Sequence, residues 1–260
     1  MSADLELAQR LADFADAITM RHFRSIDLRV ETKPDNTPVS NADREVETMI
    51  RERLAAERPG DAVVGEEFGE TGIGTRRWII DPVDATKNYV RGIPVFATLI
   101  ALEEDGDIRA GVVSAPALGA RWWAARGEGA FGGDRRLQVS RVGNLKEAQL
   151  CIAGLEEWRD TGSLDALLEL SRRCGRTRGF GDFWQHMMVA QGSAELAVEP
   201  DVSLWDMAAI KVIVEEAGGT VTDLAGVSTA GGGNAISSNG LLHEAALRYV
   251  GRPAVTSARR

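Results

Sequence analysis

Two aspartates and a threonine follow an apolar segment in a spacing that could do chemistry. Residues 78–80 read Trp-Ile-Ile, the composition of a buried strand, and Asp81, Asp84 and Thr86 come directly after them. Side chains at strand ends lie on rigid backbone and can face solvent, where catalytic groups are common. Two carboxylates this close repel each other unless a cation lies between them. The stretch therefore predicts either a metal site or a turn in which Asp84 caps a short helix.

Other acidic side chains lie at the predicted ends of helices and strands. Glu66 and Glu67 follow a short apolar run, Asp43 lies in the first turn of one predicted helix, and Asp206 opens another. Paired glutamates usually form a solvated face, and acidic residues are favoured at helix starts without any further role. Taken singly, each position leaves a metal ligand and a structural carboxylate open as alternatives.

Apolar spacing predicts the elements that must hold these side chains. Helices are expected at residues 5–22, 41–58, 164–173, 183–191, 205–217 and 241–250. Strands are expected at residues 63–64, 78–80, 95–102, 108–113, 121–126, 129–131, 150–153, 195–199, 221–222 and 235–237.

These elements predict two unlike halves. In the first, three or four antiparallel strands lie behind two helices, and residues 26–40 form a loop or a β-turn unit. The second is an α/β half with partly parallel strands. A glycine-rich turn at 132–133 places the boundary, giving an N-terminal half at 1–133 and a C-terminal half at 134–260.

Composition excludes several classes of protein. The chain has 260 residues and a net charge of -9, which argues against a general nucleic-acid binder, whose affinity comes from Lys and Arg. Its two cysteines and three scattered histidines are too few for a disulfide framework or a Cys-rich zinc site. No apolar run is long enough to span a membrane, and the first residues lack the pattern of a secretory signal. We expect a cytoplasmic protein with no nucleic-acid or membrane partner, in which any metal has oxygen ligands.

A glycine-rich segment offers a different function. Residues 127–132 match the GxGxxG pattern of dinucleotide-binding proteins, but no helical pattern follows them. We therefore expect a hairpin turn there. Of the neighbouring Trp122 and Trp123, strand alternation predicts that one points inward.

In order along the chain, the motifs read K-x-D at 33–35, GEE at 65–67, DPVDAT at 81–86 and WD at 205–206. This set resembles the inositol monophosphatase family of magnesium-dependent phosphatases, and the resemblance extends from Lys33 to the EEAGG stretch at 215–219. It implies an α/β fold, a five-layered αβαβα sandwich, commonly assembled as a homodimer.

The resemblance implies a set of oxygen ligands for two to three Mg²⁺ ions. Glu66 and Asp81 would bind one ion together with the backbone carbonyl of Val83, and Asp81, Asp84 and Asp206 would bind a second. A third, weaker ion near Glu66 would hold the attacking water. Hard oxygen ligands suit Mg²⁺.

The resemblance also implies catalytic and phosphate-binding residues. Thr86 and Asp43 would position the water, with Glu66, and the backbone N–H groups of Ala85 and Thr86 would bind the phosphate. The family usually has glycine at the position of Ala85. If the backbone there needs a positive φ, alanine costs about 1 kcal/mol, which we expect the site to tolerate.

Substrate selection is expected from Arg178, Asp182, Glu199 and Asp206. The Gly-Asp-Phe triplet at 181–183, the Trp-rich stretch at 122–127 and residues 81–92 are similar to the histidinol-phosphate phosphatases of this family. A carboxylate at Asp182 would suit a cationic alcohol, although it could equally cap the helix at 183–191. Arg178 would contact the phosphate or reach across a dimer.

Three functions remain open from the sequence. The first is hydrolysis of L-histidinol phosphate by metal-activated water with in-line attack, a step of histidine biosynthesis. The second is hydrolysis of inositol 1-phosphate, a sugar bisphosphate or a nucleotide 3′-phosphate on the same fold. The third is a catalytically silent regulatory or metal-binding protein, which Ala85 favours and the complete carboxylate set opposes.

Overall fold

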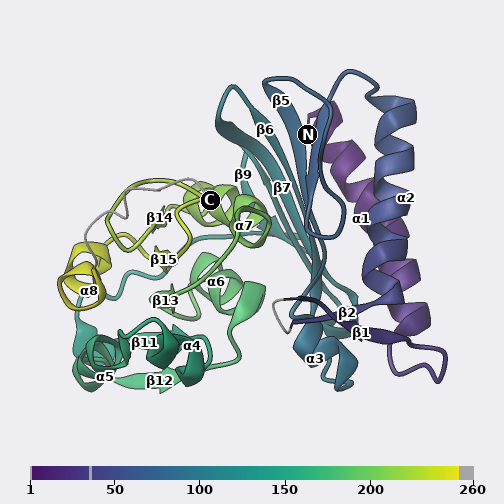
Figure 1. Cartoon of the computed structure of the whole chain (residues 1–260). Coiled ribbons are helices and arrows are strands. Elements are labelled where there is room, and N and C mark those ends of the chain that lie inside the picture. The colour runs from purple at the N-terminus through teal and green to yellow at the C-terminus, as the bar shows by residue number, and fades with distance from the viewer. Residues whose placement is uncertain (1, 35–36, 252–260) are drawn as a thin grey trace.

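Two β-sheets alternate with three layers of helices in the computed structural model (Figure 1). The structure describes residues 2–34 and 37–251. Asp35 of the K-x-D motif and the polar tail after Gly251 lie outside the described residues. Along these layers the order is α, β, α, β, α, as the family resemblance implied.

The helices are α1 (Ala3–His22), α2 (Asn41–Glu57), α3 (Thr86–Val90), α4 (Leu155–Asp160), α5 (Leu164–Arg173), α6 (Asp182–Ala190), α7 (Leu204–Glu216) and α8 (His243–Val250). Two short 3₁₀ helices are η1 (Pro116–Leu118) and η2 (Leu145–Glu147). The eight-stranded sheet contains, in spatial order, β10 (Arg135–Arg136), β9 (Gly129–Gly132), β8 (Ala120–Ala125), β7 (Asp107–Ala115), β6 (Ala97–Glu104), β5 (Arg76–Asp84), β3 (Ala62–Gly65) and β4 (Gly69–Thr71). The five-stranded sheet contains β12 (Arg176–Arg178), β11 (Gln149–Ile152), β13 (Leu196–Glu199), β15 (Ala235–Ser238) and β14 (Thr220–Thr222). A separate hairpin pairs β1 (Val30–Thr32) with β2 (Pro38–Ser40).

The central strand β5 is apolar on both faces because helices cover both sides of its sheet. Trp78 and Ile80 pack toward α1 and α2, and Ile79 points the opposite way, into the core shared with α6 and α7. This is the two-residue alternation of a strand. Asp81, one residue further on, therefore lies on the α7 side of the sheet.

Helix α7 lies between the two sheets and is buried on all sides. The sequence predicts one apolar face, but every residue from Met207 to Val214 is buried. A helix that is apolar all round belongs in a core, and this one contacts strands of both sheets. Its approach to β7 is close: a Cβ on Gly111 would lie 2.9 Å from Cα of Ala209, so only glycine fits there.

The second half has the predicted mixed arrangement. β11 is parallel to β12 and β13, whereas β15 is antiparallel to β13 and β14. Apolar residues of α4, α5 and α8 cover its outer face. Our division of the chain at residue 133 stays a prediction; β10, just beyond it, pairs with β9 of the eight-stranded sheet.

The first sheet is larger than the predicted three or four antiparallel strands. It includes β3, which is parallel to β5, and the short edge strand β4. The sequence gives no sign of the strands β1 and β12 or of helix α4, and it offers a short helix at the position of α3 only as one alternative. The strands β1 and β12 are short and largely exposed, so they lack the apolar alternation by which a sequence identifies a strand.

The segment that matches GxGxxG is a hairpin, as predicted. It connects β8 to the antiparallel strand β9, and no helix follows. Trp122 is buried, with its ring 6.1 Å from that of Phe183, while the half-buried Trp123 stacks on Phe131 on the opposite face. No helix within residues 2–34 and 37–251 is long and apolar enough to cross a lipid bilayer.

Candidate functional site

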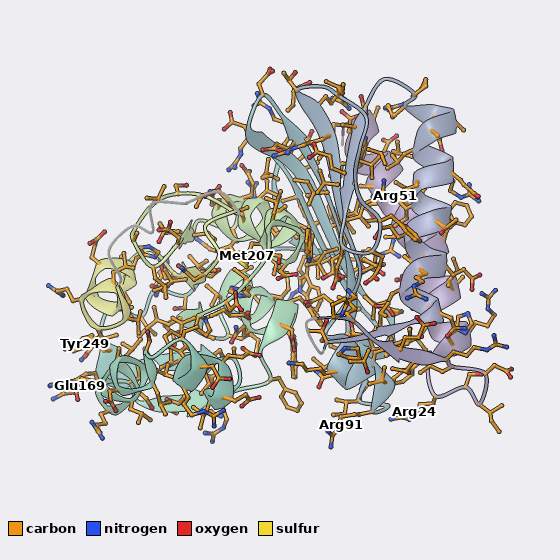
Figure 2. The ribbon with its side chains drawn as sticks, viewed as in Figure 1. Arg24, Arg51, Arg91, Glu169, Met207 and Tyr249 are labelled. Carbon is orange, nitrogen blue, oxygen red and sulfur yellow. The ribbon has the colours of Figure 1, made fainter. Side chains whose placement is uncertain are left out.

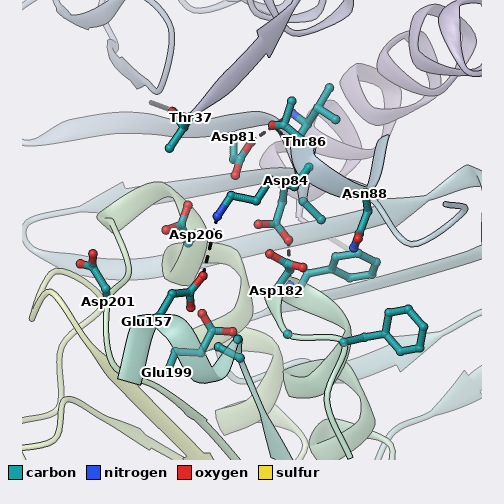
Figure 3. A pocket seen from close by; sticks show the side chains of 18 of the residues that line it. Thr37, Asp81, Asp84, Thr86, Asn88, Glu157, Asp182, Glu199, Asp201 and Asp206 are labelled. Atoms are coloured by element: carbon teal, nitrogen blue, oxygen red, sulfur yellow. Dashed lines mark hydrogen bonds and ion pairs between the residues drawn. The ribbon is translucent and has the colours of Figure 1, made fainter. Parts of the chain in front are cut away.

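Two neighbouring aspartates at the end of β5 meet a third aspartate from the start of α7. Asp81, Asp84 and Asp206 each place a carboxylate oxygen within 4.8 Å of the others. Figure 3 shows them around one pocket, with Thr86 beside Asp81. Oxygen ligands in this number suit a divalent cation such as Mg²⁺.

An irregularity in β5 turns Asp81 and Asp84 toward the same side. Residues three apart in a regular strand face opposite ways, but the pairing of β5 with β6 shifts by one residue between Asp81 and Asp84. Asp81 Oδ1 accepts the N–H of Val83 at 3.0 Å. Asp84 does not cap α3; its Oδ2 accepts the N–H of Phe183 in α6 at 2.8 Å and so joins the two halves.

Asp206 and Asp43 occupy equivalent positions in two helices. Each is the third helical residue of a capping box, in which its carboxylate accepts the backbone N–H of Ser203 or Ser40 at 2.6 and 2.9 Å. Asp206 also belongs to the carboxylate cluster. Asp206 therefore both caps α7 and belongs to the site, because the cap fixes its carboxylate at the pocket.

The cluster is unfavourable without a cation. Burial raises the pKa of Asp81 and Asp84 well above the ordinary value, and repulsion from Glu66 adds to this at Asp81. Burial likewise raises the pKa of Asp206 to about 7. Charged carboxylates buried together need a compensating positive charge, so the donor set fits a metal ion.

Glu66 lines the same pocket but is paired with a lysine. Lys33 Nζ lies 2.7 Å from Glu66 Oε1 and 2.6 Å from Glu67 Oε1. Burial lowers the pKa of Lys33, but its bonds to the two glutamates outweigh this and raise it. Burial raises the pKa of Glu67 to about 6. The expected solvated face is thus a partly buried ion-pair cluster beside the aspartates.

Thr86 joins the first turn of α3 to two residues named by the family resemblance. Its hydroxyl lies 2.9 Å from the Val83 carbonyl oxygen and 3.3 Å from Asp43 Oδ1, either of which can accept its hydrogen bond. Asp43 is fully buried, and burial raises its pKa. Thr86 and Ala85 both line the pocket.

Ala85 has the left-handed backbone that glycine favours, with φ 65° and ψ 44°. For an L-residue this conformation costs roughly 1–2 kcal/mol. The family's usual glycine therefore corresponds to a real backbone requirement, which alanine meets under strain.

We expect Ala85→Gly to change little. Removing the strain is offset by the greater freedom of glycine in the unfolded chain, so the free energy of unfolding should change by less than about 1 kcal/mol. Phosphate release should stay within about threefold of the wild type, because the backbone N–H is kept. Urea denaturation and steady-state phosphate release measure the two quantities. A manyfold rise in turnover would show that alanine disables the site.

The pocket has a volume of about 380 Å³ and continues from the aspartates toward the second half. Asp182 and Glu199 line it there, and burial raises their pKa to about 8 and about 7. Asp182 makes no side-chain cap for α6 and has φ 54°. Arg178 lies in β12, where its exposed guanidinium donates to the Thr177 carbonyl; it does not line this pocket.

The pocket also contains residues that sequence reasoning did not single out. Glu157 in α4, Asp201 and Lys87 line it, as does His186, whose pKa burial lowers to about 3. His186 Nδ1 lies 2.7 Å from Ser237 Oγ. Acidic residues are common at helix starts, so those that follow Gly154 in α4 are not distinctive. Nothing in their spacing connects them to Asp81 and Asp84, more than 70 positions earlier.

Comparison with known proteins agrees with this geometry. The inositol monophosphatase family model matches residues 1–252. The chain belongs to the inositol monophosphatase family. It is 55% identical to the histidinol-phosphatase of Streptomyces coelicolor over 95% of this chain and 96% of that protein. It is 50% identical to the histidinol-phosphatase of Mycobacterium tuberculosis, over 94% and 96% of the two chains.

A solved family structure has the same fold. The inositol monophosphatase from Zymomonas mobilis superposes with a TM-score of 0.85 at 30% identity, covering 96% of this chain and 99% of that one. The α/β sandwich predicted from the motifs is confirmed. Inositol monophosphatase family membership accounts for the acidic cluster at the pocket, because the family is generally metal-dependent.

Proposed function

We propose that this protein is a Mg²⁺-dependent phosphomonoesterase that hydrolyses L-histidinol phosphate to L-histidinol and phosphate. One observation carries the choice of substrate: the pocket that begins at the aspartate cluster ends in a second acidic group, formed by Glu157, Asp182 and Glu199. The first group suits a metal-bound phosphate, and the second suits an alcohol that carries an amine and an imidazole. The names of the two bacterial relatives support the same substrate.

Two to three Mg²⁺ ions would be held by the residues of the first acidic group. Glu66, Asp81 and the Val83 carbonyl form one ligand set, and Asp81, Asp84 and Asp206 form another. Ions held by these residues would neutralise the phosphoryl oxygens, lower the pKa of a water and stabilise the leaving oxygen.

The remaining site residues orient the reactants. Thr86 is placed to hold a water, because the buried Asp43 and the Val83 carbonyl lie within reach of its hydroxyl. Glu66, which lines the same pocket, would help to hold this water. The backbone N–H groups of Ala85 and Thr86 would bind the phosphate, so that water attacks in line with the leaving alcohol. No covalent phosphoenzyme is expected.

The second acidic group would select the alcohol. Asp182 and Glu199 are buried carboxylates that form no ion pair with a lysine or arginine of the described residues, and an ammonium or imidazolium group would offset their repulsion. A neutral alcohol such as inositol leaves that repulsion in place. Asp206 lies between the two groups and would contact both.

Phosphate release in Mg²⁺ tests the proposal directly. The panel is L-histidinol phosphate, inositol 1-phosphate, fructose 1,6-bisphosphate and adenosine 3′,5′-bisphosphate. We expect strong preference for histidinol phosphate, which would place the enzyme in histidine biosynthesis. Preference for another ester would keep the phosphatase and overturn the substrate, whereas no release from any ester despite Mg²⁺ binding would favour a silent protein.

Asp182→Asn should impair the cationic substrate selectively. Asparagine tolerates the positive φ of this position, so the backbone is kept. Loss of one charge-assisted contact should lower kcat/KM for histidinol phosphate about tenfold and leave inositol 1-phosphate hydrolysis unchanged or improved. Asp165→Asn, in the first turn of α5 outside the pocket, is the matched control. Equal losses on both esters would mean that Asp182 only maintains the fold.

We also propose a cytoplasmic homodimer. Both cysteines are free thiols, which suits a reducing compartment. Arg178 is exposed at the edge strand β12, from which it could reach a partner's pocket rather than its own. Sedimentation measures the assembly, and a mixed-subunit assay with an Arg178→Ala chain measures the contribution across it.

A further inference from the structure

Lys87 is the one lysine or arginine among the described residues that line the pocket. It follows Thr86 in α3, while Glu157 lies in α4 on the other side of the pocket. Lys87 Nζ is 3.9 Å from Glu157 Oε1, and the two side chains are 68% and 35% exposed. This ion pair therefore connects the phosphate end of the pocket to its second acidic group (Figure 3 shows Glu157, Asp182 and Glu199 there).

Among the described residues that line the pocket, no other lysine or arginine faces the second acidic group. Burial is the largest cause of the raised pKa of Glu157 and Asp182, and repulsion from Glu199 is the second. The positive charge of Lys87 acts to lower both pKa values. An independent feature marks the same region as a place for a ligand. His186, 1% exposed, lines the pocket, and its Nε2 lies 3.4 Å from Glu199 Oε1 but makes no hydrogen bond among the described residues.

We propose that Lys87 takes the place of the substrate's ammonium group in the empty pocket. This inference rests on the proposed function and adds a specificity-determining pair to it. Lys87 pairs with Glu157 when no substrate is bound, and an ammonium-bearing alcohol replaces it there. Lys87 then keeps its position next to Thr86, at the phosphate end of the pocket.

The geometry makes this exchange easy. An ion pair that is largely exposed contributes little free energy, so Lys87 leaves Glu157 at small cost. A substrate ammonium would lie deeper, among Glu157, Asp182 and Glu199, where water screens charges less. Lys87 therefore competes with substrates that carry an ammonium group and not with neutral ones. Lys87 therefore weakens the preference for an ammonium-bearing substrate, while Glu157 supplies the attraction.

Two esters that differ in one group test the pair. L-Histidinol phosphate carries the ammonium, and 3-(imidazol-4-yl)propyl phosphate lacks only the amino group. The readout is the ratio of kcat/KM for the first ester to kcat/KM for the second, because any general effect on phosphate binding cancels in it. Lys87→Gln should raise this ratio about threefold, the size of an exposed ion pair. Glu157→Gln should lower it about tenfold.

The double variant separates competition from two independent effects. If Lys87 acts through Glu157, Lys87→Gln leaves the ratio unchanged in the Glu157→Gln background. Asp160→Asn, an exposed acidic residue of the same helix, should leave the ratio unchanged in the wild-type background. Thermal unfolding of each variant establishes that the fold is kept.

The outcomes distinguish this inference from the proposed function. If the wild-type enzyme hydrolyses histidinol phosphate but neither Lys87→Gln nor Glu157→Gln changes the ratio of kcat/KM values, the proposed role of the Lys87–Glu157 pair is wrong. The proposed phosphatase function is then unaffected. A fall in the ratio on Lys87→Gln would also overturn the role of the pair, since Lys87 would then assist the ammonium substrate. A wild-type enzyme without activity on histidinol phosphate would overturn the proposed function, and this inference with it.

Discussion

Replacing Asp84 by asparagine should lower kcat/KM about a thousandfold, the loss expected when one charged ligand of a catalytic metal is removed. The amide oxygen of asparagine can still accept the N–H of Phe183, so the contact between the two halves should survive. The same change removes one of three repelling charges from a buried cluster. The metal-free variant should therefore be more stable than the metal-free wild type, by about 1–2 kcal/mol.

Two measurements on the same variant check both effects. Steady-state phosphate release gives kcat/KM, and denaturation in EDTA gives the free energy of unfolding without metal. Asp201→Asn is the control, because Asp201 lines the pocket outside the aspartate cluster. It should keep activity within about tenfold of the wild type. If Asp84→Asn lowered both activity and metal-free stability, Asp84 would be a structural carboxylate and the metal assignment would be wrong.

Removing metal should abolish phosphate release, and adding Mg²⁺ should restore it. Mg²⁺ would bind only the folded protein, because the cluster combines residues from β5 and α7. At about a hundredfold excess over Kd, such binding would stabilise the fold by about 2.7 kcal/mol. For a chain of this size, that corresponds to a rise in Tm of about 5–10 °C.

Thermal unfolding in EDTA and in a series of Mg²⁺ concentrations measures this shift without reference to activity. The Asp84→Asn variant should show a much smaller rise, and the Asp201→Asn variant should show a rise equal to that of the wild type. If the wild-type Tm does not change up to millimolar Mg²⁺ and the activity resists EDTA, no metal binds at this cluster.

Met207 and Arg51, both labelled in Figure 2, lie in helices that the sequence predicts but in surroundings that it does not. Met207 lies in α7, whose apolar composition identifies it as a helix, but only the second sheet explains why every side of that stretch of the helix is buried. Arg51 lies on α2, where it pairs with Glu47 of the same helix and also donates to Thr71 in β4, which lies 20 positions further along the chain. Local patterns identify an element, whereas its surroundings depend on contacts distant in sequence.

The sequence by itself determined the family, the sandwich fold and the aspartates that meet at the pocket. It could do so because these depend on local order: an apolar strand, the spacing of Asp81 and Asp84, and an acidic residue at a helix start. From the residues alone, Asp84 could be a metal ligand or part of a turn, and Asp206 could be a metal ligand or only a helix cap.

Only the tertiary structure decided those choices. The extra residue in β5 turns Asp81 and Asp84 to one side, and the start of α7 brings Asp206 to them from more than 120 positions away. The packing of the two halves also brings Lys87 in α3 to Glu157 in α4. Within the first half, the chain after β1 brings Lys33 to Glu66, which follows β3. No pattern within one segment predicts these contacts. The physical reason is that the free energy that stabilises them comes from burial and charge interactions between segments distant in sequence.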